Sequence, residues 1–130
     1  YIVFNGRTGA LVEHGQLKAK VGEKVRIFFG NAGVSKISSF HIIGEIFDKV
    51  YAEASLSNTL KDVQTTLVPA GGASMVEFEV DYPGNYVLVD HALTRIDRGA
   101  WGILKVTGNK DTSLYAGEFA GNEHSEKKHE

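Results

Sequence analysis

Residues 17–29 read LKAKVGEKVRIFF, and apolar and polar side chains alternate along most of this stretch. A period of two is typical of a β-strand that turns one face to the core and the other to water. Gly22 interrupts the alternation, and a glycine between two such runs favours a tight turn. The stretch therefore predicts two consecutive half-buried strands, whose inward residues are Leu17, Ala19, Val21, Val25, Ile27 and Phe29.

The same alternation returns further along the chain, where glutamates separate Val76, Phe78 and Val80. Turn-forming residues separate the apolar runs, and the chain holds 15 glycines. Many short strands with regular turns between them are typical of an antiparallel β-sandwich. We therefore expect an all-β fold, with turns at 21–23, 30–33, 69–72, 83–85 and 107–109.

Two segments depart from the strand pattern and could be helical. Residues 54–60 form either one turn of helix or an irregular loop. Residues 92–100 carry Leu93 and Ile96 at helical spacing, and Gly99 can end a short helix there. We expect at most one or two short helical segments beside the strands.

The composition is that of one globular domain followed by a polar tail. With 130 residues, 42% of them hydrophobic, the chain is long enough to bury a core. Its last residues are polar and lose the alternation, so we expect a domain at 1–110 and an extended polar tail at 111–130. A net charge of −2 offers no electrostatic basis for binding nucleic acid.

The chain contains no cysteine. This excludes disulfides, thiolate-bound metals and a blue-copper centre within the chain itself. Neither a phosphate-binding glycine loop nor a serine nucleophile motif is present. The residues that could carry chemistry are therefore mainly histidines.

Five histidines are present. His124 and His129 belong to the polar tail and His14 to a predicted turn, where solvent exposure is the plainer interpretation. His41 lies within an apolar strand, either as a satisfied half-buried side chain or as a proton donor near neutral pH. His91 ends another apolar strand, a common position for a ligand, and as a metal ligand it would need partners from elsewhere.

A family resemblance goes beyond these arguments. Residues 83–91 (PGNYVLVDH) resemble the strand that leads into the metal-binding loop of cupredoxins, with Asp90 where a blue-copper domain has its cysteine. Together with four other pieces in order, they resemble the second cupredoxin domain of copper-containing nitrite reductases. Residues 40–51 look most like the outer-membrane, neisserial-type branch. The other pieces are 4–11, 40–44, 67–72 and 99–102 with 104–106.

The resemblance implies a cupredoxin-like Greek-key β-sandwich that lacks a type 1 copper site. It also implies the C-terminal half of a dissimilatory nitrite reductase, which reduces nitrite to nitric oxide. Enzymes of this family are trimers of two-domain subunits, with type 1 copper in the first domain and type 2 copper between subunits. His91 matches the type 2 copper ligand that comes from the second domain. His41 matches the histidine that delivers protons, together with an aspartate of the other domain.

The resemblance assigns three further residues to the same pocket. Ile43 matches the residue that crowds the substrate over the metal, and Leu93 lines the pocket. Thr65 matches a position near the catalytic histidine, where its hydroxyl could orient the ring. Gln64 stands where many relatives have a glutamate.

The implied partners are an N-terminal cupredoxin domain of the same enzyme, nitrite, and a cupredoxin or cytochrome electron donor. The implied location is the periplasm or the outer membrane of a Gram-negative bacterium. Because the first domain is absent from this sequence, we expect the chain alone to bind copper weakly and to reduce no nitrite. Two alternatives stay open: a metal-free structural or binding cupredoxin domain, and a fragment of another multicopper oxidase. The second usually uses His-X-His ligand pairs, and this sequence contains none.

Overall fold

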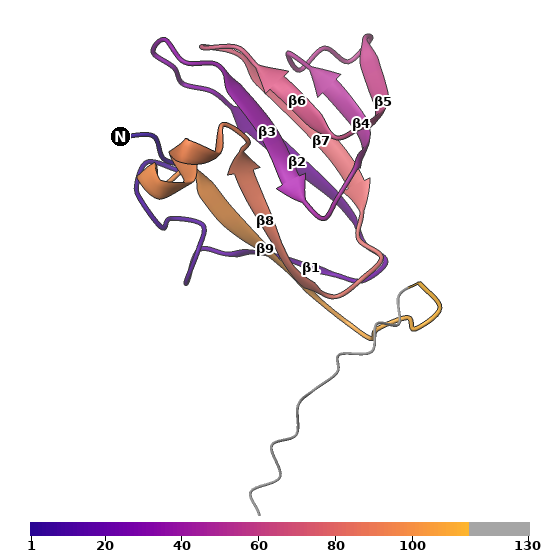
Figure 1. Cartoon of the computed structure of the whole chain (residues 1–130). Helices are drawn as coiled ribbons and strands as arrows, with labels where there is room; N and C mark the ends of the chain where they lie inside the picture. The colour runs from indigo at the N-terminus through magenta and orange to yellow at the C-terminus, as the bar shows by residue number, and fades with distance from the viewer. Residues whose placement is uncertain (115–130) are drawn as a thin grey trace, which may run out of the picture.

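The computed structural model describes residues 1–114, which form two β-sheets and one short 3₁₀ helix (Figure 1). The elements in chain order are β1 (Leu17–Lys20), β2 (Lys24–Gly30), β3 (Ser38–Ile43), β4 (Phe47–Ala52), β5 (Thr59–Val63), β6 (Thr65–Val68), β7 (Ala73–Glu79), β8 (Gly84–Asp90), η1 (Leu93–Arg98) and β9 (Trp101–Thr107).

The strands form a sandwich of two layers. One sheet has the order β1-β9-β8-β3-β6 and the other the order β2-β7-β4-β5. β1 pairs with β9 in parallel, and the other pairings are antiparallel. Because the chain passes from one sheet to the other several times, neighbours in a sheet are often distant in sequence. The expected all-β, Greek-key sandwich is confirmed.

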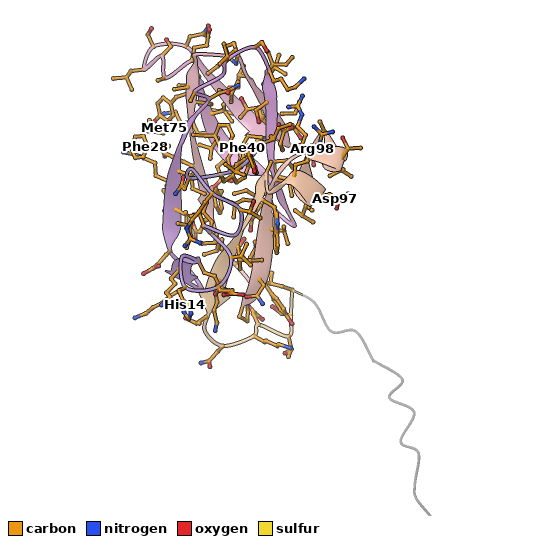
Figure 2. All side chains as sticks on the ribbon, turned by 90° about the vertical axis from the view of Figure 1, so that its left-hand side faces the viewer. His14, Phe28, Phe40, Met75, Asp97 and Arg98 are labelled. Atoms are coloured by element: carbon orange, nitrogen blue, oxygen red, sulfur yellow. The ribbon has the colours of Figure 1, made fainter. Side chains whose placement is uncertain are left out.

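The core lies between the sheets and is rich in phenylalanine. The rings of Phe29 and Phe40 stack with centroids 4.3 Å apart, and Phe40 stacks in turn on Phe47 at 5.7 Å. Figure 2 shows Phe40 in the middle of the molecule, whereas Phe28 and Met75 lie on the outer side of the β2–β7 pair. Burying one such ring stabilises the fold by about 1.5–3 kcal/mol. Because Phe29 and Phe47 belong to the four-stranded sheet, the aromatic stack fixes β3 against that facing sheet.

The helical predictions have mixed outcomes. Residues 92–100 contain η1, and Gly99 ends it in the left-handed conformation (φ 109°), as expected. The helix alternative for 54–60 is wrong: the chain there is a loop that leads into β5, because Thr59 and Leu60 pair with β4. The turn expected at 83–85 comes earlier, since β8 already begins at Gly84. Across the part of the chain that the structure describes, no helix is long and apolar enough to cross a membrane.

The polar tail was expected at 111–130. Residues 111–114 form a turn in which the Leu114 N–H donates to the Asp111 carbonyl oxygen at 3.2 Å. The rest of the predicted tail, with His124 and His129, lies outside the described residues.

Candidate functional site

His41 and His91 meet on the outer face of the five-stranded sheet. Phe40 and Ile42 of β3 are fully buried in the core, so the alternation of the strand turns His41 to the opposite face. β3 pairs with β8 in the register Phe40↔Asp90, and this pairing brings the residue after β8 next to β3. The two imidazole rings lie 5.3 Å apart between centroids, at an angle of 62°. His41 and His91 are distant in sequence, and the β3–β8 pairing brings their imidazoles together.

The Nδ1 atom of the half-buried His41 is held by the chain entering β6. It lies 2.6 Å from the backbone carbonyl oxygen of Gln64. A carbonyl oxygen only accepts, so Nδ1 carries the hydrogen and the neutral ring leaves its Nε2 lone pair free. The hydroxyl oxygen of Thr65 lies 3.5 Å from the same Nδ1, at the outer limit of a hydrogen bond. The ring is thus oriented mainly by the Gln64 backbone and only secondarily by Thr65.

His91 is exposed and directly follows β8, rather than ending the strand as expected. Its backbone N–H donates to the carbonyl oxygen of Ser39 at 2.8 Å, which ties it to the start of β3. Within residues 1–114, no group of three or more histidine, cysteine or acidic side chains could hold a metal ion. Imidazole is a good copper ligand, but a transition metal needs more donors than His91 can give. A metal at His91 would therefore need ligands from another domain or chain.

Apolar side chains surround the histidine pair without being buried. Ile43 follows His41 on the same face of β3 and is 47% exposed. Leu93 begins η1 shortly after His91 and is 50% exposed. Leu67, two positions beyond Thr65 on β6, is 60% exposed and was not expected to contribute. Ile43, Leu67 and Leu93 therefore form an exposed apolar surface beside the histidines.

His14 is not part of this arrangement. It lies exposed in the loop before β1, well apart from Asp97 and Arg98 of η1 (Figure 2). The surface interpretation of His14 is therefore the better one, and the histidine serves as a natural control.

Sequence reasoning missed a buried polar cluster beside His91. Asp90 is 3% exposed, and its carboxylate accepts hydrogen bonds from Ser38 Oγ at 3.0 Å and Arg95 Nη1 at 2.6 Å. The backbone N–H groups of Ser39 and Ala92 donate to its other oxygen at 3.4 and 3.1 Å. The signal for this cluster was an aspartate at the end of an apolar strand.

The charge state of Asp90 follows from these donors. Burial alone would raise the pKa of Asp90, but the hydrogen bonds from Arg95, the Ala92 N–H and Ser38 outweigh burial. The pKa of Asp90 is consequently lowered, and the carboxylate is ionised at neutral pH. Arg95, with a side chain 20% exposed, is its counter-charge.

Comparisons with known proteins show which proteins this chain is similar to. No family model matches the chain. The chain is 53% identical over 116 residues to the copper-containing nitrite reductase of Neisseria meningitidis serogroup B, covering 88% of the chain and 29% of that protein. It is 35% identical, again over 88% of its length, to the copper-containing nitrite reductase of Neorhizobium galegae, of which it covers 30%.

Solved structures agree with these sequence relatives. A copper-containing nitrite reductase from Thermus scotoductus superposes with a TM-score of 0.79 at 30% identity, over 85% of this chain and 26% of that one. The copper nitrite reductase of Nitrosomonas europaea gives a TM-score of 0.68 at 36% identity, over 73% and 33% of the two chains. A multicopper oxidase gives 0.64 at 27% identity, over 71% and 32%. The expected cupredoxin-like fold is confirmed.

The match covers most of this chain but only part of each relative. The chain spans about 30% of the length of the curated nitrite reductases that it matches. The identity is also higher to the neisserial proteins, at 53%, than to the rhizobial one, at 35%. The chain therefore resembles the second, C-terminal cupredoxin domain of copper-containing nitrite reductases, and it does so most strongly in the comparison with the neisserial branch.

Proposed function

We propose that this chain is the second cupredoxin domain of a dissimilatory enzyme that reduces nitrite to nitric oxide. The reaction occurs at a type 2 copper that lies between subunits, to which this chain supplies one ligand and a proton donor. The observation that carries the proposal is the 5.3 Å separation of the His41 and His91 rings, in a chain 53% identical to neisserial copper nitrite reductases.

His91 is the copper ligand in this proposal. Its imidazole is exposed, and its donor chemistry suits copper. The lack of a three-residue metal cluster in the described part of the chain is consistent with a site that two subunits complete. When bound, copper would supply the transferred electron and an open position for the nitrite oxygens.

His41 is the proton donor. Reduction of one nitrite ion consumes one electron and two protons and yields nitric oxide and water. A protonated His41 keeps its Nδ1–H on the Gln64 carbonyl and can give its Nε2 proton to the departing oxygen. The ring then returns to its neutral form without turning over, ready to take up another proton. Such proton transfer typically contributes about 10²–10⁴ in rate.

The remaining residues shape the pocket. Ile43 and Leu93 present exposed apolar side chains beside the histidines, and they would restrict how nitrite sits and keep water away. Thr65 would support the orientation of the His41 ring through its hydroxyl. An aspartate from the other domain would act together with His41 in delivering the two protons.

The partners follow from the incomplete site. An N-terminal cupredoxin domain would carry the type 1 copper, two type 2 ligands and the aspartate, and the assembled enzyme would be a homotrimer. The limited coverage of the relatives, about 30%, supports such an additional domain. A cupredoxin or cytochrome would deliver electrons, and the enzyme would work in denitrification in the periplasm or at the outer membrane.

The test is nitrite-dependent nitric oxide production by this chain in complex with an N-terminal cupredoxin domain, on one polypeptide or two. We expect activity in the complex, none in either part alone, and loss of activity with His91→Ala. The matched control is His14→Ala, an exposed histidine away from η1, which should keep full activity. Full activity with His91→Ala would favour the metal-free or other multicopper alternatives over this assignment.

A further inference from the structure

We propose that the buried Asp90 carboxylate is a positioning group, which sets the direction of the His91 side chain and its separation from His41. The inference rests on the proposed function in one respect, that His91 is a copper ligand. The geometry itself can be tested without copper.

The Asp90 carboxylate joins the start of β3 to the residues that follow β8. One oxygen accepts from Ser38 at the start of β3 and from Arg95 of η1, at 3.0 and 2.6 Å. The other oxygen accepts from the backbone N–H groups of Ser39 and Ala92. A single side chain at the end of β8 therefore holds the start of β3 and the turn into η1 together.

His91 lies inside this set of contacts. The bond from the Ala92 N–H to Asp90 Oδ1, at 3.1 Å, closes a small ring around the His91 backbone. On the other side, the His91 N–H donates to the Ser39 carbonyl oxygen at 2.8 Å. With both flanking peptides fixed, the His91 side chain can leave the backbone in only a narrow range of directions.

The same contacts fix His91 relative to His41. Ser39 donates its N–H to Asp90 and lies two positions before His41 on the same face of β3. The next residue, Phe40, is stacked between Phe29 and Phe47, so this piece of strand cannot shift freely. The 5.3 Å between the imidazoles is thus set through one short, well-packed segment.

Arg95 completes the cluster and anchors η1. Its Nη1 atom donates to Asp90 and also to the carbonyl oxygen of Ile37 at 2.7 Å, just before β3. Asparagine cannot replace Asp90 here, because it has one acceptor oxygen and one amide nitrogen. In one orientation the amide nitrogen would face the N–H groups of Ser39 and Ala92, and in the other it would face Arg95 and the Ser38 hydroxyl, of which only the hydroxyl can turn to accept. Asp90→Asn keeps the size of the side chain but must break at least one of its contacts, that to Arg95 or those to the two backbone N–H groups.

The experiment uses the full copper-loaded enzyme with Asp90→Asn, Ser38→Ala or Arg95→Lys. The controls are Asp97→Asn and Arg98→Lys, two exposed residues of η1 that point outward in Figure 2. We measure the affinity for copper at the His91 site, the electron paramagnetic resonance spectrum of that copper, and the crystal structure of each metal-free variant.

We expect Asp90→Asn to weaken copper binding by about 10–100-fold, the usual loss when a group supporting a ligand is removed. The spectrum should change, and the ring separation should move by more than about 0.5 Å, the tolerance of a working site. Ser38→Ala should give a smaller change in the same direction, and the two controls should match the parent enzyme.

The proposal is overturned if Asp90→Asn and Ser38→Ala keep the parent copper affinity, spectrum and ring separation. If Asp90→Asn fails to fold, Ser38→Ala, which removes a single donor, decides the matter by the same three measurements. If the parent enzyme binds no copper through His91, the proposed function fails, and the metal-free crystal structures still show whether Asp90 holds the two rings.

Discussion

The carboxylates of Asp90 and Glu45 lie near opposite ends of β3, the strand that carries His41, and their pKa values shift in opposite directions. Asp90 meets the start of β3 and is nearly completely buried, yet its pKa is lowered because four donors surround it. Glu45 follows the end of β3, and its pKa is raised to about 7. Burial is the main cause there, and the charges of Asp81 and Asp48 add to it.

Burial raises the pKa of both carboxylates, and the number of hydrogen-bond donors decides whether it is outweighed, as at Asp90, or not, as at Glu45. Around Asp90, side-chain and backbone donors from β3 and η1 converge, and they keep the histidine end of the strand in one arrangement. Around Glu45, the Ile46 N–H alone opposes the effects of burial and of neighbouring acids. One end of β3 is therefore stabilised by its carboxylate, and the other end is destabilised whenever its carboxylate ionises.

The largest expected effect is on turnover of the assembled enzyme. His41→Ala should leave copper bound and slow nitrite reduction at least tenfold, toward the 10²–10⁴ typical of a lost general acid. Steady-state rates and copper analysis on the same preparation measure both quantities. Loss of the metal in this variant would contradict a purely proton-transferring role.

The next largest effect is expected on stability, when the Asp90 carboxylate is removed. Asp90→Ala leaves Arg95 without its counter-charge and two N–H groups without an acceptor, so we expect a loss of about 3–5 kcal/mol in the free energy of unfolding. Urea denaturation measures this loss. Asp97→Ala, at an exposed position of η1, is the control and should cost little. An equal loss of unfolding free energy in Asp90→Ala and Asp97→Ala would contradict the stabilising role of the Asp90 carboxylate.

Glu45→Gln should act in the opposite direction. Because the folded pKa of Glu45 is raised from 4.5 to about 7, the folded state holds an extra proton between these values. Stability is therefore fully present below about pH 4.5 and falls as the pH rises through 7. After allowing for solvent screening, Glu45→Gln should stabilise the protein by about 1 kcal/mol at pH 8 and by nothing at pH 4. Denaturation at both pH values, with the exposed Glu13→Gln as control, tests the sign.

The smallest effects concern the support of the His41 ring. The contact at 2.6 Å comes from the Gln64 backbone, so Gln64→Ala should leave turnover unchanged. Thr65→Val removes a hydroxyl at 3.5 Å and should slow turnover about twofold, in keeping with a weak hydrogen bond worth about 0.5 kcal/mol. Both variants keep the Gln64 carbonyl, so the two rates measured side by side show how much the Thr65 hydroxyl adds to it.

Local patterns predicted much of the fold. The alternation at Val25 and Ile27 was correct because it reflects one face of a single strand, and Gly99 was correct as a helix end because it needs a positive φ. The helix alternative at 54–60 was wrong because pairing of Thr59 and Leu60 with β4 overrode local preference.

The site depended on long-range pairing. His41 and His91 came together in prediction only through the family resemblance, since their contact follows from the β3–β8 register. The Asp90 cluster was missed because half of its donors are backbone N–H groups, which a sequence does not distinguish. Of its other donors, Ser38 comes from a distant segment that only the folded chain brings near, and Arg95 lies close in sequence but points to Asp90 only because η1 turns it there.

The most direct test of the central claim is the copper content of the assembled enzyme with His91→Ala beside His41→Ala. If His91 is a ligand of the shared copper and His41 its proton donor, His91→Ala should lose the type 2 copper and His41→Ala should keep it. Full type 2 copper in the His91→Ala enzyme would contradict the account.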